Sequence, residues 1–194
     1  MKTSFKLTLL VALFAAIFFS SCSYNTMVEK QEATSSQWAQ VQNAYQRRAD
    51  LIPNLVATVK GYAKHEEGTL TAVIEARAKA TQITIDPTKL TEENIQKYQQ
   101  AQGQLGAALG RLMMVKESYP DLKANQNFMA LQDELTGTEN RIAVERNKFN
   151  TVVQDYNQYI RKFPQVIWAG WFGFSKKGYF EADAGAKNAP KVEF

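Results

Sequence analysis

The chain has 194 residues, with 23 basic and 19 acidic side chains and a net charge of +4, and it is long enough for one domain with a real core. Its basic residues form no stripe with interleaved aromatic side chains, so the sequence argues against nucleic-acid binding. A single cysteine excludes an intramolecular disulfide and a CxxC redox or zinc motif.

The first 21 residues have the features of a secretory signal. Lys2 and Lys6 form a positive start, and an uncharged apolar run of 13 residues follows at Leu7–Phe19. This run is shorter than the roughly 20 residues that span a bilayer. The small residues before Cys22, in "FSSC", resemble the lipobox of bacterial lipoproteins, in which Cys22 would be acylated and become the mature N-terminus. The alternative is an uncleaved membrane anchor with an incidental cysteine.

A first long helix is predicted from Met27 to Tyr62, because apolar side chains recur there at alternating spacings of three and four residues. The pattern passes Pro53 without a shift. A helix that ended at this proline would have no reason to keep the same face on both sides, so we expect Pro53 to kink a continuous helix.

After Tyr62 the pattern fails, and "HEEGT" predicts a corner into a second helix at about 67–82. His65 could act in this corner as a base or a metal ligand beside Glu66 and Glu67. The side chains of adjacent residues point in different directions, however, and a single histidine provides too few ligands for a typical metal site. We therefore predict a solvated corner with no catalytic or metal site.

A third helix is predicted at about 91–118, after a turn at Asp86 and Pro87. Thr91 is a suitable N-cap, and the glutamates that follow it suit the first turn of a helix. The three glycines within this helix have poor helix propensity, so we interpret them as points where a neighbouring helix approaches closely, with a ligand groove as the alternative. These glycines are Gly103, Gly106 and Gly110.

The longest predicted helix covers about 121–163, about 64 Å at roughly 1.5 Å per residue. Pro120 suits its first turn, and Pro164 suits its end. A strict three-four alternation that begins at Phe128 visits eleven positions, of which nine are apolar or aromatic. Such a stripe cannot bury itself and requires partner helices, as in a coiled coil. The predicted fold class is therefore all-α, a bundle of about four long helices.

Two charged residues occupy seam positions that apolar residues would normally take, Arg48 in the first helix and Glu145 in the fourth. One interpretation places both at the edge of the seam with their charges in water. The other joins them across the two helices as a partly buried pair that fixes the alignment.

The stretch "FPQVIWAGWFGFSKKGYF" at 163–180 crowds aromatic residues among glycines without a helical period, so we expect an irregular tail. This tail either folds back and caps one end of the bundle or exposes a surface for a protein partner or a lipid headgroup region. The candidate partner-binding residues are Trp168, Trp171, Phe172 and Phe174. We expect three segments: a signal peptide over 1–21, a helical bundle over 22–163 and the irregular tail over 164–194.

Three long stretches, "RRADLIPNLVATVKGYAKHE", "ALGRLMMVKESYPDLKANQNFMALQDELTGTENRIAVER" and "FNTVVQDYNQYIRKFP", with the closing "PKVEF", resemble the LemA family. The resemblance spans roughly 24–194. It implies an elongated antiparallel helical bundle held at the bacterial cell envelope by an N-terminal membrane segment. The chain departs from the family pattern at Cys22, where other members mostly keep a transmembrane helix.

The sequence contains no GxSxG, HExxH, P-loop or dinucleotide-binding motif, and we predict no catalytic residue, metal or cofactor. The predicted function is that of a non-enzymatic, membrane-anchored scaffold or interaction protein. The alternative is an adaptor or accessory factor for a membrane protease or an envelope signalling system. The expected partners are a membrane, reached through acylated Cys22, and an unidentified protein, with no nucleic acid.

The predicted location is the outer membrane, with the bundle facing the periplasm. Ser23, which follows the acylated cysteine, is not the aspartate that often retains a lipoprotein at the inner membrane. An inner-membrane location with an uncleaved N-terminal helix is the alternative.

Overall fold

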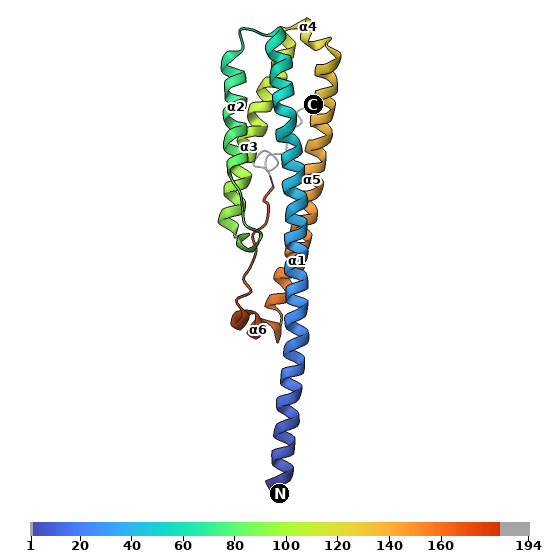
Figure 1. The fold of residues 1–194 in the computed structure, drawn as a ribbon, viewed down its shortest axis with the longest axis vertical. Helices are drawn as coiled ribbons and strands as arrows, with labels where there is room; N and C mark the ends of the chain where they lie inside the picture. The colour runs from blue at the N-terminus through green and yellow to red at the C-terminus, as the bar shows by residue number, and fades with distance from the viewer. Residues whose placement is uncertain (1, 183–194) are drawn as a thin grey trace, which may run out of the picture.

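A computed structural model of the protein describes the backbone of residues 2–182 and the side chains of residues 23–182. Over this range the chain forms six α-helices, two short 3-10 helices and no β-strand, so the predicted all-α class is confirmed. Figure 1 shows an elongated bundle, with the N-terminal part of the first helix projecting alone from one end. In the part of the chain described, no helix combines the length and the apolar character that crossing a bilayer requires.

Helix α1 (Lys2–Tyr62) is continuous over 61 residues, which corresponds to roughly 90 Å. Its predicted seam faces the bundle, and Met27, Trp38 and Val59 are fully buried. The seam ends one residue later than predicted, because Tyr62 is exposed and Ala63 takes the buried position.

Pro53 lies inside α1, as predicted, with its ring on the exposed side. Because proline has no N–H, the carbonyl of Ala49 lacks the helix donor that residue 53 would normally supply. Arg77 of helix α2 (Glu67–Gln82) fills this place, and its Nε donates a hydrogen bond of 2.8 Å to that carbonyl. Because the proline leaves the Ala49 carbonyl without a helix donor, this carbonyl can accept the hydrogen bond that links α1 to α2.

The corner before α2 covers residues 63–66, and α2 itself has the predicted bounds. Leu70, Val73 and Ala80 are buried on its inner face. Ile74 and Ala78, which continue the apolar pattern of this helix, are exposed.

The connection to the third helix contains the 3-10 helix η1 (Pro87–Lys89), where the Asp86 carboxylate accepts a hydrogen bond from the Thr88 N–H at 2.8 Å. Helix α3 (Glu92–Met114) follows. Oγ1 of Thr91 accepts from the N–H of Asn94 at 3.3 Å, which confirms the predicted N-cap. The predicted last turn of α3 is a separate, tighter 3-10 helix, η2 (Val115–Ser118).

The single helix predicted over 121–163 is wrong, because the chain breaks it near its start. Helix α4 (Pro120–Lys123) is one turn long, and α5 (Gln126–Arg161) is the long helix. The side chain of Asn125 accepts from the N–H of Phe128 at 2.9 Å and so caps the new helix. The hydrophobic pattern begins at Phe128, inside α5, and therefore carried no information about the break.

The buried stripe of α5 follows the predicted positions up to Phe149, except at half-buried Leu131, and beyond Phe149 it moves by one residue at all positions but Tyr156. Val153 and Ile160 are buried, whereas Val152 and Tyr159 are only half-buried. A helix with 3.6 residues per turn drifts relative to a strict repeat of 3.5, which explains the shift.

The long helices pack in pairs, with α1 along α5 and α2 along α3, and α1 also contacts α2. Three buried apolar clusters follow one another along the bundle. The first surrounds Leu55 and Leu122 at the α4 end, and the second surrounds Trp38 in the middle. The third joins Met27 to Tyr156, near the end from which α1 projects.

The glycines of α3 do not mark close helix contacts, so that interpretation is wrong. A Cβ at Gly103 or Gly110 would meet nothing within 4 Å, and one at Gly106 would meet only the guanidinium of Arg48, at 3.9 Å. Gly103 and Gly106 instead line a groove, and ligand binding in it stays a prediction.

The C-terminal tail contains a short helix, α6 (Gln165–Phe172), which was not predicted. Gly173 ends this helix with a φ of 77°, in the left-handed region that glycine favours. From there to residue 182 the chain has no helix and returns along the bundle between α3 and α5 (Figure 1). The closing "PKVEF" lies outside the described residues.

Candidate functional site

Helix α6 carries an apolar surface that the bundle does not cover. Trp171 is 75% exposed and Phe163, just before the helix, is 81% exposed. The helix contains no charged residue. Contiguous exposed apolar side chains of this kind mark interaction sites more often than solvent-facing scaffold. We define the α6 surface as the five exposed apolar residues Phe163, Val166, Ile167, Trp171 and Phe172.

The opposite face of α6 is fixed to α1 and α5. Ala169 is buried in the third cluster, and Trp168 and Phe174 pack against that cluster while half-buried. The ring of Tyr24, near the start of the described side chains, meets Phe172 edge-on with the centroids 5.0 Å apart. It also meets Phe174 edge-on at 5.8 Å. The α6 surface therefore has a fixed place beside α1.

The remainder of the described tail is part of the core. Phe180 is 4% exposed, stacks on Trp38 with the centroids 6.0 Å apart and meets Phe149 edge-on at 5.5 Å. Gly178 passes so close to α3 that a Cβ there would lie 2.6 Å from the Cα of Glu92. Only glycine allows this approach.

Lys177 is held between α5 and η1. The side chain of Asn157 accepts from the Lys177 N–H and donates to its carbonyl, both at 2.9 Å. The ammonium of Lys177 donates to the carbonyls of Pro87 and Thr88 at 3.3 and 3.2 Å. Burial lowers the pKa of Lys177, and the nearby Asp86 partly opposes this shift. The side chain works as an internal link rather than as a reactive amine.

The tail folds back as one of the two expectations had it, but it packs along the middle of the bundle and does not cap an end. Its later part, with Phe180, packs in the bundle, whereas α6 leaves Trp171 and Phe172 exposed. Of the four candidate partner-binding residues, Trp168 and Phe174 are half-buried against the third cluster. Partner binding by these residues stays a prediction.

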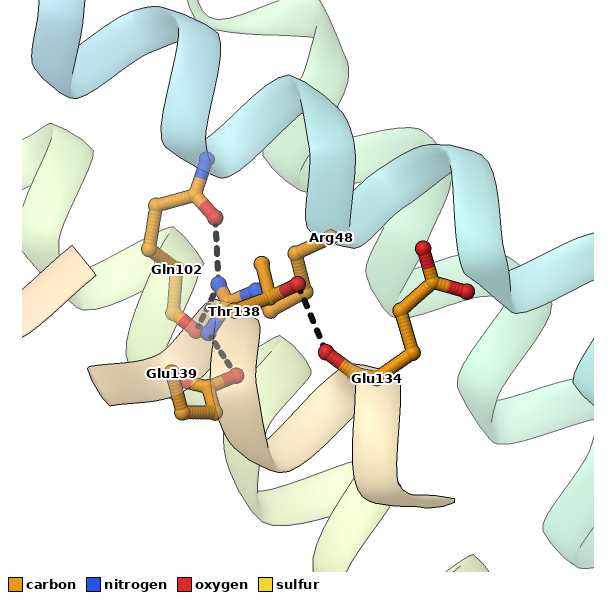
Figure 2. Close-up of polar contacts among 5 residues, drawn as sticks. All are labelled: Arg48, Gln102, Glu134, Thr138 and Glu139. Carbon is orange, nitrogen blue, oxygen red and sulfur yellow. Dashed lines mark hydrogen bonds and ion pairs between the residues drawn. The ribbon is translucent and has the colours of Figure 1, made fainter. Parts of the chain in front are cut away.

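Arg48 is the centre of a buried polar network that joins three helices (Figure 2). It is 3% exposed, and its Nη1 donates to Glu139 of α5 at 2.9 Å. Its Nη2 donates to the side chain of Gln102 of α3 at 2.5 Å and to the Gln102 carbonyl at 3.1 Å. Beside the network, Thr138 donates to the carbonyl of Glu134 at 2.8 Å.

The structure does not join Arg48 to Glu145, so the predicted pair is wrong. The alternative, in which the Arg48 charge lies in water, is also wrong because the guanidinium is buried. Glu145 accepts a hydrogen bond of 2.7 Å from Gln37 of α1 and one of 3.1 Å from Lys148. These two bonds hold the pKa of Glu145 below its usual range. Glu145 therefore does connect α1 to α5, but through a neutral partner.

A groove of about 440 Å³ opens beside this network, between α3 and α5. Arg48 and Arg146 lie in its wall with Gly103 and Gly106. Both guanidinium groups already donate within the chain, Arg48 as described and Arg146 to the carbonyl of Glu181 at 2.8 Å. The basic groups of the groove are thus engaged in holding helices and tail together.

His65 is exposed in the corner before α2, where a solvated position was predicted. Among the described residues, no group of three or more His, Cys, Asp or Glu side chains could hold a metal ion. Cys22, the predicted lipidation site, lies outside the described side chains.

Some of these residues carried a signal in the sequence, and others did not. Gln102 stands between Tyr98 and Leu105 in the apolar stripe of α3, which is the same pattern that singled out Arg48. Glu139 is next to a seam position and gave no sign of its role. The exposure of Val166 depends on how α6 docks, which a local pattern does not specify.

A family model described as the LemA family matches residues 37–194 of the chain. The chain is 28% identical over 175 residues to magnetosome protein MamQ 2 of Paramagnetospirillum magneticum, covering 81% of the chain and 64% of that protein. It is 27% identical over 174 residues to magnetosome protein MamQ of Magnetospirillum gryphiswaldense, with the same coverage. It is 24% identical over 139 residues to protein LemA of Metamycoplasma hominis, covering 72% and 60%. The chain spans less than two thirds of the length of these curated relatives.

Proposed function

The chain belongs to the LemA family, and on this basis we propose that it acts as a non-enzymatic, membrane-anchored helical scaffold of the bacterial cell envelope. The observation that carries the proposal is α1, one helix that continues from the N-terminal segment through the bundle (Figure 1). A chain anchored at Cys22, where the part of α1 left after cleavage begins, would hold its bundle as a rod that projects from the membrane and presents its sides to other proteins.

The proposed anchor is an acylated Cys22, after cleavage of a signal peptide at residues 1–21. The proposed location is the outer membrane, with the bundle in the periplasm. A single acyl chain gives only marginal membrane binding, so stable attachment requires the several chains that a mature bacterial lipoprotein carries.

The scaffold role is supported by the way in which the chain uses its buried polar groups. Arg48, Glu145 and Lys177 each bond to a different element of the bundle, so their chemistry serves to hold the rod together. Among the described residues, five of the eleven exposed large apolar side chains belong to the α6 surface, and the others are spread over the bundle. Polar groups that hold the bundle together, with apolar side chains left on the surface, favour an interaction protein over an enzyme.

Cys22→Ser tests the anchor. We expect the variant to accumulate as a larger precursor and to lose labelling by a palmitate analogue, because serine cannot form the thioether. Gel mobility and labelling in cells measure both effects. Ser21→Ala is the matched control, since it keeps a small residue before the cysteine and should be processed normally. Normal processing of Cys22→Ser, with full membrane retention, contradicts lipid anchoring.

Crosslinking in intact cells tests the scaffold role, with reactive groups placed on exposed positions of α2 and α5. We expect mass spectrometry to recover a reproducible set of envelope proteins. Recovery of cytoplasmic proteins alone contradicts the proposal.

A further inference from the structure

The α6 surface lacks the polar side chains that a solvent-facing helix normally presents. Val166, Ile167, Gly170 and Trp171 follow one another at the spacing of a single helix face, opposite the buried Ala169. A helix that packs one face on protein is expected to be polar on the other. Because α6 is apolar on both faces, we expect its outer face to bind a second apolar surface.

Basic residues flank this surface on both sides. The sequence between Asp155 and Glu181 holds four basic residues and no acidic one. Arg161 and Lys162 precede α6 and Lys176 follows it, and all three are exposed. An apolar helix that contains tryptophan and is bracketed by cations matches an anionic bilayer surface. Lipid phosphates attract the cations there, and aromatic rings favour the headgroup level.

The position of α6 in the fold places this surface beside the N-terminal segment. Figure 1 shows α6 at the end of the bundle from which α1 projects. Tyr24, which holds Phe172, is two residues or about 3 Å along the helix axis from Cys22. It is five residues or about 7.5 Å from Phe19, the end of the apolar run. Either form of N-terminal anchor therefore brings α6 to the surface of the bilayer.

We propose that the α6 surface inserts its apolar side chains into the headgroup region of the anionic bilayer that holds the N-terminus. The inference rests on the proposed membrane anchoring and adds a second point of attachment to it. A chain held only at its N-terminus can tilt freely, whereas a chain held there and at α6 has one defined orientation. Lipid is the occupant that the position and the flanking charges favour.

The test uses the full chain on vesicles that contain phosphatidylglycerol, with brominated lipids as contact quenchers. The chain has three tryptophans, and Trp168→Phe leaves Trp38 and Trp171. Trp38 is fully buried in the bundle, so Trp171 reports on the α6 surface. We expect brominated lipid to quench about half or more of the Trp171 emission, because a ring at headgroup level lies within contact distance. Aqueous iodide should lose its access to Trp171.

A matched control places the probe at the opposite end of the bundle. Met114 ends α3 on the side of α4, and it is a 68% exposed apolar residue. Met114→Trp, combined with Trp168→Phe and Trp171→Phe, should stay open to iodide and insensitive to brominated lipid. The same chain without the Met114 change gives the Trp38 background.

Flotation of the vesicles separates this inference from the anchoring on which it rests. A chain that does not float overturns both. A chain that floats while Trp171 stays open to iodide and unquenched by lipid overturns the α6 inference and leaves the anchoring intact. That second outcome would direct the search for an occupant of this surface to a protein partner.

Discussion

Arg47 and Arg48 are adjacent and carry the same charge, but their surroundings differ, so we expect them to contribute differently to the free energy of unfolding. Arg48 is buried with partners on α3 and α5, whereas the side chain of Arg47 is 62% exposed and pairs with Glu134 at the surface. Arg48→Ala leaves Oε1 of the buried Gln102 without its guanidinium donor and opens a void. We expect it to lower the free energy of unfolding by about 3 kcal/mol. Arg47→Ala should cost less than about 1 kcal/mol.

Urea unfolding of the two variants measures this difference. Equal losses for Arg47→Ala and Arg48→Ala would show that the network around Arg48 contributes no more than a surface pair.

The sequence identified Arg48 as a polar residue in an apolar seam, but it did not identify its partners. Partner choice depends on the rotation of each helix about its axis, and a seam pattern fixes that rotation only to within a residue. It also depends on Gln102, which lies on α3, whereas the predicted pair involved only the first and fourth helices. Glu145 shows the same limit, because its partner Gln37 lies one residue from a seam position.

At the scale of helices, the proline of α1 makes possible a hydrogen bond between α1 and α2. The Ala49 carbonyl accepts from Arg77 because Pro53 supplies no donor there. Arg77→Ala should therefore lower the free energy of unfolding by about 1.5 kcal/mol, as is typical when a charged donor leaves a partly buried acceptor. In the Pro53→Ala background the helix can bond the carbonyl itself, so the same change should cost less.

A double-mutant cycle on Pro53 and Arg77, followed by denaturant unfolding, measures this coupling. Pro53→Ala alone should be tolerated, because the ring is exposed and the helix is continuous on both sides. A coupling energy of zero contradicts the link.

Helix bounds were predictable where a local signal coincided with the true end of an element. The bounds of α2 and the Thr91 cap follow from glycine, threonine and the apolar period. The break at Asn125 is set by one capping side chain outside the apolar stripe, so periodicity could not place it. Helix α6 is apolar on all sides and therefore has no period to detect.

At the scale of the whole molecule, the later part of the tail packs into the centre of the bundle, whereas α6 lies on its surface. Phe180 is fully enclosed by the second cluster, so Phe180→Ala should lower the free energy of unfolding by about 3 to 5 kcal/mol. Trp171→Ala removes a larger but mostly exposed ring and should change the stability of the free chain by less than about 1 kcal/mol.

Thermal and urea unfolding of the two variants in solution, without vesicles, test this contrast. A Trp171→Ala variant as unstable as Phe180→Ala would mean that α6 is also part of the core.

The stack of Phe180 on Trp38 has a consequence for the order of events during synthesis. The two rings are 142 positions apart in the chain, and Phe180 follows the last residue of α5 by 19 positions. While α5 leaves the ribosome, the residues that complete the middle of the bundle are still inside the exit tunnel. The nascent chain therefore lacks part of its core until Phe180 has emerged and the tail has returned along the bundle, since so distant a contact closes late.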